Sequence, residues 1–119
     1  MRALFLLLAL LAATPASAAN VTILRVVDGD TAVTTTGERV RLACLDAPER
    51  GKRGAAAATR SLREMVQGRK VGIRRITRDR YGRTIGELYS NGKNVGQELV
   101  TSGNAWIYRR YAYQCSWAK

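Results

Sequence analysis

The sequence predicts an α+β domain that is mainly β, with five short strands and a helix after the third strand. Runs rich in β-branched residues alternate with turn residues before position 46, which is typical of strands joined by short loops. An alanine-rich stretch with helical spacing follows, and two more apolar runs come after it. Strands and helix in this order predict a small closed barrel of the oligonucleotide/oligosaccharide-binding (OB) kind, with one or two helices packed on it.

The first three strands are predicted at residues 21–27, 31–36 and 39–45. Val, Ile and Thr dominate the first two, and these residues favour strands. Asp28-Gly29-Asp30 separates strands one and two, and Gly29 would tolerate the positive φ of a tight turn. A second turn containing Gly37 leads into the third strand. Short turns of this kind predict an antiparallel meander.

Residues 55–67 are predicted to form a helix that ends at Gly68. Apolar side chains recur there at spacings of three and four and would form its buried face: Ala58, Leu62, Met65 and Val66. Two strands and a second short helix are then expected, at residues 71–76, 84–89 and 95–102. Asn91-Gly92 predicts a turn before this helix, and Gly103 would stop it.

Residues 1–19 have the pattern of a secretory signal peptide. Met1-Arg2 is basic, residues 3–13 are apolar, and Ala16-Ser17-Ala18 is a small-residue cleavage sequence. The apolar run is well short of the roughly twenty residues that a membrane-spanning helix needs. We therefore expect cleavage after Ala18 or Ala19. The mature domain would cover residues 20–119, be secreted or periplasmic, and have no stable membrane association.

The composition narrows the chemistry that is available to the chain. Twenty Lys and Arg residues against nine Asp and Glu give a net charge of +11, which favours a polyanionic partner. There is no histidine, so a histidine base and a Ser–His pair are excluded. Together with only two cysteines, this also excludes the common structural zinc sites. Carboxylate, arginine and metal chemistry is what remains.

The two cysteines, Cys44 and Cys115, leave two interpretations open. Export would permit a disulfide between them. Cys44 lies in an apolar run, so a buried free thiol is an equal alternative.

Three stretches carry the candidate functional residues: Asp28-Gly29-Asp30-Thr31, then Arg41-Leu42-Ala43-Cys44-Leu45-Asp46-Ala47-Pro48-Glu49, then Asp79-Arg80-Tyr81-Gly82-Arg83. Carboxylates at the ends of strands suit a hard cation such as Ca²⁺, which takes oxygen ligands from several chain segments. Taken alone, the first stretch is better explained as a hairpin turn and the second as a solvated loop, since turns are rich in Asp and Gly. The third stretch alone is as consistent with a solvated charged turn as with a functional one.

In this order and spacing the three stretches resemble the staphylococcal (micrococcal) nuclease family. The later Leu99-Val100-x-x-Gly103-x-Ala105-Trp106 is similar to the family's second helix and the segment after it, so the resemblance runs from about Val21 to Tyr111. It implies an OB-fold phosphodiesterase that depends on Ca²⁺, hydrolyses DNA and RNA without sequence preference and leaves 3′-phosphates. We expect it to act as a monomer.

The resemblance also implies a cation site. Asp30 and Asp46 would be the carboxylate ligands of Ca²⁺, and Ala47 would contribute its backbone carbonyl oxygen. Asp28 and Thr31 match positions that support this site.

Catalytic and substrate-binding roles are implied in the same way. Glu49 would orient or deprotonate the attacking water, and Arg41 and Arg83 would hold the scissile phosphate. Arg80 and Tyr81 match positions that contact nucleotide. Two further aromatic side chains are candidates for base stacking: Tyr108 and Tyr111. Trp106 has apolar neighbours and is expected in the core instead.

The C-terminal sequence departs from the family pattern. Family domains usually continue with a third helix and a Gly-Leu-Trp-like ending, and here the sequence stops after residues 111–119. We therefore expect the third helix to be missing and the domain to be less stable. A disulfide between Cys44 and Cys115 would compensate for part of that loss.

Two other functions are compatible with the sequence. A non-catalytic OB-fold module that binds nucleic acid would have the same fold, but retention of the full acidic and arginine set argues against it. An incomplete and inactive nuclease domain is the alternative that a missing third helix leaves open. A cationic surface-active protein would have the same charge, but the sequence contains no obvious amphipathic basic helix.

Overall fold

A computed structural model of the chain describes residues 19–119. The predicted signal peptide falls almost entirely on residues 1–18, which lie outside the described residues, so its removal stays a prediction. Within residues 19–119 no helix is both long enough and apolar enough to cross a membrane.

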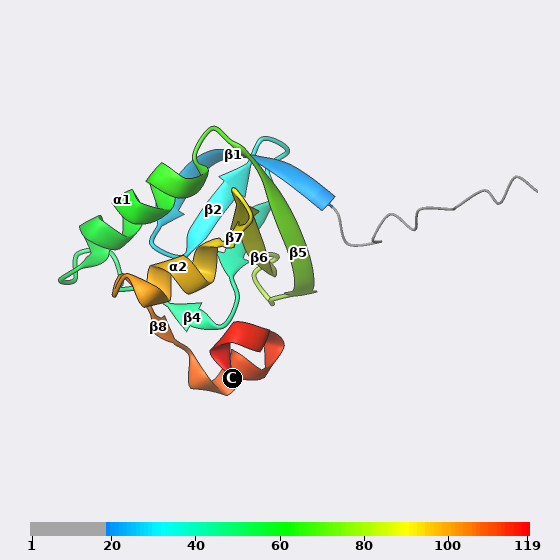
Figure 1. The fold of residues 1–119 in the computed structure, drawn as a ribbon. Coiled ribbons are helices and arrows are strands. Elements are labelled where there is room, and N and C mark those ends of the chain that lie inside the picture. The colour runs from blue at the N-terminus through cyan, green and yellow to red at the C-terminus, as the bar shows by residue number, and fades with distance from the viewer. Residues whose placement is uncertain (1–18) are drawn as a thin grey trace, which may run out of the picture.

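Five strands close into the barrel that the sequence predicts (Figure 1). They are β1 (Ala19–Asp28), β2 (Thr31–Thr34), β3 (Arg39–Leu42), β5 (Lys70–Arg78) and β6 (Thr84–Ser90). Neighbours are antiparallel in the order β3-β2-β1-β5-β6, and β6 returns to pair with β3 in parallel, which closes the barrel. This confirms the mainly β OB-fold architecture.

Two helices cover the barrel. α1 (Ala55–Val66) buries Ala58, Leu62 and Val66 against it, as its spacing predicts, while Met65 packs at the edge of the core. The short strand β7 (Lys93–Asn94) follows the turn at residues 91–92 and leads into α2 (Val95–Thr101). The Asn94 side chain accepts a hydrogen bond from the Gln97 backbone N–H and caps α2.

The third strand is shorter than predicted. It ends at Leu42 instead of residue 45, because Cys44 adopts a φ of 73° and turns the chain away from the barrel. The next two residues form β4 (Leu45–Asp46), which pairs antiparallel with β8 (Trp106–Ile107). The predicted strand is thus divided between the barrel and a separate two-stranded sheet.

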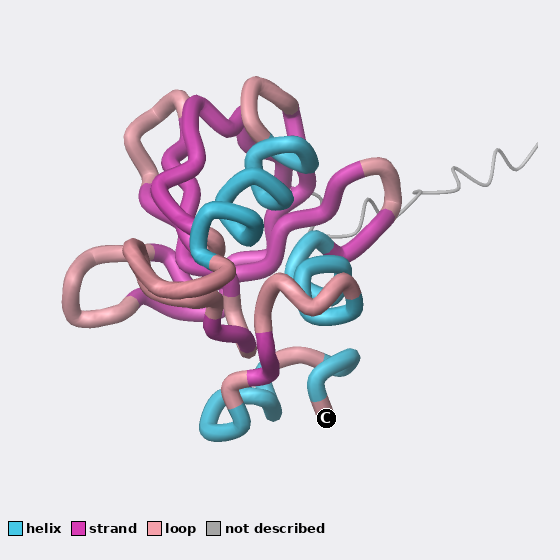
Figure 2. The backbone as a smooth tube through the Cα atoms, turned by 90° about the vertical axis from the view of Figure 1, so that its left-hand side faces the viewer, coloured by secondary structure: helices cyan, strands magenta, loops and turns pink. Residues whose placement is uncertain are grey.

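The C-terminal segment forms 3₁₀-helical turns below the barrel (Figure 2). They are η1 (Arg109–Gln114) and η2 (Ser116–Ala118), and residues 19–119 contain no third α-helix. A disulfide joins Cys115 to Cys44, and both residues are buried in a small second cluster with Ala43 and Ala118. Of the two interpretations of the cysteines, the structure has the disulfide.

A buried carboxylate provides a second anchor for this segment. Glu87 is 5% exposed and accepts a 2.7 Å hydrogen bond from the Trp117 indole N–H. Its other donors are Arg74, Tyr89 and Asn94. Burial alone would raise the pKa of Glu87, but these donors lower it below its ordinary value. The charged carboxylate therefore ties η2 to strands β5, β6 and β7.

Glu38 stabilises the closed barrel in a pH-dependent way. Its carboxylate accepts hydrogen bonds from Arg75 at 2.7 and 2.8 Å and from the Thr84 hydroxyl at 2.7 Å, so it connects the β2–β3 turn to β5 and β6. The Arg75 hydrogen bonds are the main reason that the pKa of Glu38 falls from 4.5 to about 2.

We expect Glu38→Gln to lower the free energy of unfolding. A carboxylate whose pKa falls on folding stabilises the folded state above its unfolded value, and this contribution is lost as the pH falls. The difference between the two proteins should be largest above pH 4.5 and shrink as the pH approaches 2. Urea denaturation at several pH values measures it, and a difference independent of pH would contradict the assignment.

Removing the disulfide should destabilise the domain. We expect Cys44→Ala/Cys115→Ala to lose about 2–5 kcal/mol of unfolding free energy, the usual effect in a small domain. Alanine suits both positions because each side chain lies in an apolar cluster. Urea denaturation of the oxidised wild type and the double variant gives the value. Equal midpoints would mean that the disulfide contributes nothing to stability.

Candidate active site

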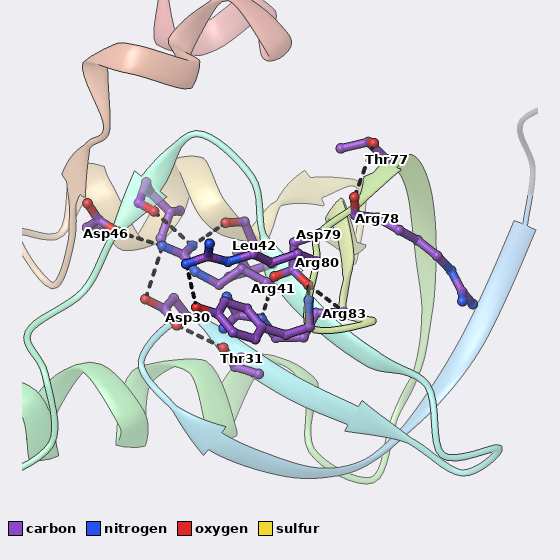
Figure 3. Close-up of polar contacts among 12 residues, drawn as sticks. Asp30, Thr31, Arg41, Leu42, Asp46, Thr77, Arg78, Asp79, Arg80 and Arg83 are labelled. Atoms are coloured by element: carbon purple, nitrogen blue, oxygen red, sulfur yellow. Dashed lines mark hydrogen bonds and ion pairs between the residues drawn. The ribbon is translucent and has the colours of Figure 1, made fainter.

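Arg41 lies at the centre of the candidate site (Figure 3). Its Nη2 is 2.5 Å from Asp46 Oδ1 and 3.6 Å from Asp30 Oδ2. Its Nη1 donates to the backbone carbonyls of Leu42 at 2.6 Å and Leu45 at 2.9 Å. One guanidinium, 15% exposed, therefore joins the turn before β2, the end of β3 and strand β4. The two predicted metal-binding carboxylates meet at this group.

The turn between β1 and β2 fixes the position of Asp30. Asp28 Oδ1 accepts the Asp30 backbone N–H at 3.1 Å, and the Thr31 hydroxyl donates to Asp30 Oδ1 at 2.9 Å. The backbone N–H of Ala47 donates to Asp30 Oδ2 at 3.4 Å. Both residues predicted to support the cation site thus contact Asp30.

Gly29 is needed for space and not for a positive φ, contrary to the expectation from the Asp-Gly sequence. Its φ is not among the positive values of the described residues. A Cβ at this position would lie 2.7 Å from the Cβ atoms of both Ala47 and Ala58. Helix α1 therefore packs directly on the turn that carries Asp30, and only glycine leaves room for it.

The electrostatics of Asp30 favour a cation beside it. Burial raises the pKa of this carboxyl above its ordinary value, the Arg41 charge opposes that shift, and Asp28 adds to it. A positive charge near Asp30 therefore stabilises its ionised form.

A groove of about 680 Å³ lies beside Arg41. It brings together five further residues from the sequence prediction: Arg80, Tyr81, Arg83, Tyr108 and Tyr111. The residues come from β3, the β5–β6 hairpin and the C-terminal segment, which are far apart in the sequence.

The β5–β6 hairpin holds one wall of the groove. Asp79 Oδ2 accepts a 2.7 Å hydrogen bond from Arg83 Nε, and Asp79 Oδ1 accepts the backbone N–H groups of Tyr81 and Arg83. Burial alone would raise the pKa of Asp79, but the Arg83 and Tyr81 hydrogen bonds lower it below its ordinary value. The guanidinium groups of Arg80 and Arg83 lie 5.0 and 5.7 Å from the centre of the Tyr81 ring. Asp79 thus sets the direction of Arg83, a function that its turn sequence did not reveal.

The C-terminal segment supplies the aromatic side chains of the other wall. Tyr108 and Tyr111 pack edge to face with ring centres 5.2 Å apart, and both rings are more than a third exposed. Arg110 lies 5.5 Å from the centre of the Tyr111 ring. This wall therefore combines aromatic faces with positive charge, which suits a nucleic-acid strand.

Glu49 lies exposed in the loop between β4 and α1. Among residues 19–119 no hydrogen bond or ion pair joins its side chain to Asp30, Arg41 or Asp46. Within the same residues no group of three or more Asp, Glu, His or Cys side chains is arranged to hold a metal ion. The carboxylates that contact Arg41 are those of Asp30 and Asp46.

Trp106 corrects the sequence interpretation. It was expected in the core, but it is 53% exposed, while the next residue, Ile107, packs inward on the second cluster. The two residues form strand β8, in which successive side chains alternate between faces. Because this strand is only two residues long, its alternation could not be recognised before its pairing with β4 was known.

The donor set fits a small divalent cation. Asp30 and Asp46 already share one positive nitrogen of Arg41, so their oxygens converge on a position that attracts a cation. Carboxylate and carbonyl oxygens are the ligands that Ca²⁺ and Mg²⁺ prefer. The Ala47 backbone adjoins this pair through its N–H bond to Asp30.

Comparison with known proteins shows that the chain is similar to nucleases. Residues 39–118 match the family described as staphylococcal nuclease homologue. The chain is 38% identical over 93 residues to an uncharacterized endonuclease of Escherichia coli, which covers 75% of this chain and 61% of that protein. It is 36% identical over 101 residues to a micrococcal nuclease of Shigella flexneri, which covers 75% of this chain and 58% of that protein. It is 37% identical over 81 residues to a staphylococcal-like nuclease of Arabidopsis thaliana, which covers 68% of this chain and 25% of that protein. The chain thus spans about six-tenths of the length of the bacterial relatives.

Adding one methyl group at Gly29 should disturb both the fold and the site. We expect Gly29→Ala to cost about 1–3 kcal/mol of unfolding free energy, because overpacking displaces α1 or the loop at Ala47. Gly72→Ala is the control, since Gly72 has no positive φ and the atom nearest to an added Cβ there lies at 3.4 Å. Urea denaturation compares the two. A loss for Gly29→Ala no larger than that for Gly72→Ala would show that the packing at Gly29 is loose.

Proposed function

The chain belongs to the staphylococcal nuclease family, and we propose that it is an exported, Ca²⁺-dependent nuclease that hydrolyses the phosphodiester bonds of DNA and RNA. One observation carries this proposal: Arg41 and Arg83 line the same groove, and Arg41 also contacts both Asp30 and Asp46. The groove thus has two permanent cations for a phosphate beside a carboxylate pair for a metal ion.

Asp30, Asp46 and the backbone carbonyl of Ala47 would hold Ca²⁺. When bound, the ion supplies positive charge that polarises a phosphoryl oxygen and lowers the repulsion of an incoming nucleophile. Side chains of the protein would bind the phosphate and accept the proton of the attacking water.

Arg41 and Arg83 would bind the non-bridging oxygens of the scissile phosphate. A guanidinium donates two parallel hydrogen bonds to a phosphate and stays charged at any working pH. Asp79 would keep Arg83 directed by its 2.7 Å bond to Nε, which leaves the two terminal nitrogens for the phosphate. Arg41 would exchange its bond to Asp46 for bonds to the substrate. Both arginines would then stabilise the charge that develops on the phosphoryl oxygens.

Glu49 would accept the proton of the attacking water. The water oxygen would form the new bond to phosphorus, the proton would move to the Glu49 carboxylate, and the bond from phosphorus to the 5′-oxygen would break. The departing 5′-oxygen would take a proton from solvent and leave as a 5′-hydroxyl. The product would be a 3′-phosphate. Arg50 donates to the Val27 carbonyl at 3.0 Å and holds the loop of Glu49 near the end of β1.

The substrate would be bound mainly through its backbone. Phosphate contacts position a strand without reading its sequence, and stacking on aromatic rings tolerates every base. Arg80, Tyr81, Tyr108 and Tyr111 lie in the groove where these contacts are needed. The enzyme would act as a monomer on either nucleic acid.

A non-catalytic nucleic-acid-binding module is the second candidate function. It is favoured by Glu49, whose side chain is exposed and forms no hydrogen bond or ion pair with Asp30, Arg41 or Asp46 within the described residues. Such a module would retain the groove and bind single strands without hydrolysing them.

The two functions are separated by the activity of purified protein in Ca²⁺ and in chelator. We expect cleavage of single-stranded DNA in Ca²⁺ only, and we expect Arg83→Ala to lower the rate about 10²- to 10³-fold, because one electrostatic donor to the transition state is lost. Arg60→Ala is the charge-matched control, since Arg60 is exposed on α1. It should cleave at the wild-type rate.

Two results would contradict the proposal. Cleavage that persists in Arg83→Ala at the wild-type rate would mean that this arginine has no catalytic role or that another nuclease contaminates the sample. Binding of the strand without any cleavage in Ca²⁺ would support the binding module instead.

A further inference from the structure

Trp106 is an exposed tryptophan whose strand pairs with the strand that contains Asp46. It lies in β8, directly across the antiparallel pair from Asp46 in β4. The neighbouring pair, Leu45 and Ile107, turns inward: Leu45 is fully buried and Ile107 packs on the second cluster. Since side chains alternate along strands, Asp46 and Trp106 project together from the opposite, outer face.

This register places the indole next to the candidate active site. Facing residues in an antiparallel pair have Cβ atoms about 4.5–5.5 Å apart. Asp46 in turn contacts Arg41, which lines the groove. Figure 1 shows β4 and β8 side by side below α2. Trp106 therefore stands beside the Arg41–Asp46 ion pair.

Trp106 is close in the chain to the aromatic wall of the groove, although it is not itself among the residues that line the groove. Tyr108 follows it by two residues, about 7 Å along an extended chain, and lines the groove. The backbone N–H of Tyr108 donates to the carbonyl of Cys44 at 2.9 Å, so this part of the chain keeps its direction beside β4. The aromatic side chains of residues 106, 108 and 111 thus follow one edge of the site.

Trp106 is not part of the hydrophobic core of the described residues. It belongs to neither of the two hydrophobic clusters of residues 19–119 and is 53% exposed. The other tryptophan, Trp117, differs in both respects, because it packs on the core and donates to buried Glu87. A large flat apolar ring beside the Arg41–Asp46 ion pair suits a ligand that is flat, apolar on its faces and attached to an anionic backbone.

We propose that Trp106 is a substrate-binding residue that stacks on an unpaired nucleobase of a single-stranded nucleic acid, next to the scissile phosphate. This inference rests on the proposed function of the groove. Every base presents a π face, so the contact would add affinity without sequence preference. In a duplex, neighbouring base pairs cover both faces of each base, so the contact would favour single strands at this position.

The test is equilibrium binding to two labelled strands of equal length, oligothymidine and a backbone of abasic sites. Fluorescence anisotropy in chelator at about 0.15 M salt measures both affinities without cleavage and with phosphate attraction screened. The proteins are wild type, Trp106→Ala, Trp106→Phe and Tyr113→Ala. Tyr113 is the matched control, because it is an aromatic residue that is 68% exposed and lies in η1, outside the β4–β8 pair that contains Asp46. Circular dichroism verifies that each variant is folded.

We expect Trp106→Ala to bind oligothymidine about 5- to 150-fold more weakly, the loss of one base–aromatic stack. Its affinity for the abasic strand should not change. Trp106→Phe should keep most of the affinity for oligothymidine, and Tyr113→Ala should bind both strands as the wild type does. Should Trp106→Ala be poorly folded, Trp106→Leu replaces it. Trp106→Leu should then lose affinity for oligothymidine but not for the abasic strand, whereas Trp106→Phe should keep most of its affinity for both.

Three results would overturn the inference. Unchanged binding of oligothymidine by Trp106→Ala would show that the indole does not stack on a base. An equal loss of affinity for both strands would show that the indole contacts the backbone or acts through the fold. A wild-type dimer that Trp106→Ala converts to a monomer, seen by sedimentation, would assign the indole to an interface between copies. The proposed function fails separately: base-dependent binding without cleavage in Ca²⁺ would leave the role of Trp106 intact and refute the nuclease.

Discussion

The site depends on one guanidinium placed between two carboxylates. Without the charge of Arg41, Asp30 and Asp46 would repel each other in a partly buried place, and the carbonyls of Leu42 and Leu45 would lose their donor. Removing one member of a buried charge network commonly costs about 3–5 kcal/mol. The same contacts fix the relative positions of β3, β4 and the β1–β2 turn. A residue expected to bind phosphate therefore also organises the place where the metal ion would bind.

The second wall of the groove depends on the attachment of the C-terminal segment. Residues 109–118 form only 3₁₀-helical turns, which have little stability of their own. The Cys44–Cys115 disulfide fixes this segment to the turn after β3, and the Trp117–Glu87 hydrogen bond fixes it to the barrel. Tyr108 and Tyr111 thus lie on a segment held at two points. This wall of the groove is thus attached to the barrel although it contains no long helix or strand.

Local sequence patterns predict the barrel but not the contacts that shape the site. The strands follow from β-branched runs between turn residues, and α1 follows from apolar spacing. The break at Cys44 depends on pairing with β8, some 60 residues later, which no local pattern records. Gly29 was predicted from turn chemistry, but its reason is the close approach of α1. The same limit applies to Trp106, whose apolar neighbours indicated the core although its strand turns it outward. The ordered set of acidic and basic residues includes Arg41, Arg80 and Arg83, which line one groove. It also includes Asp30 and Asp46, which contact Arg41.

The central claim is that Asp30 and Asp46 form a binding site for a divalent cation beside this groove. Calorimetric titration of the folded protein with Ca²⁺ tests it most directly, with Asp46→Asn as the site variant and Glu64→Gln, exposed on α1, as the charge-matched control. The account predicts one bound ion in the wild type and the control, and a large loss of affinity in Asp46→Asn. Equal affinity in all three proteins, or no binding by the wild type, would contradict it.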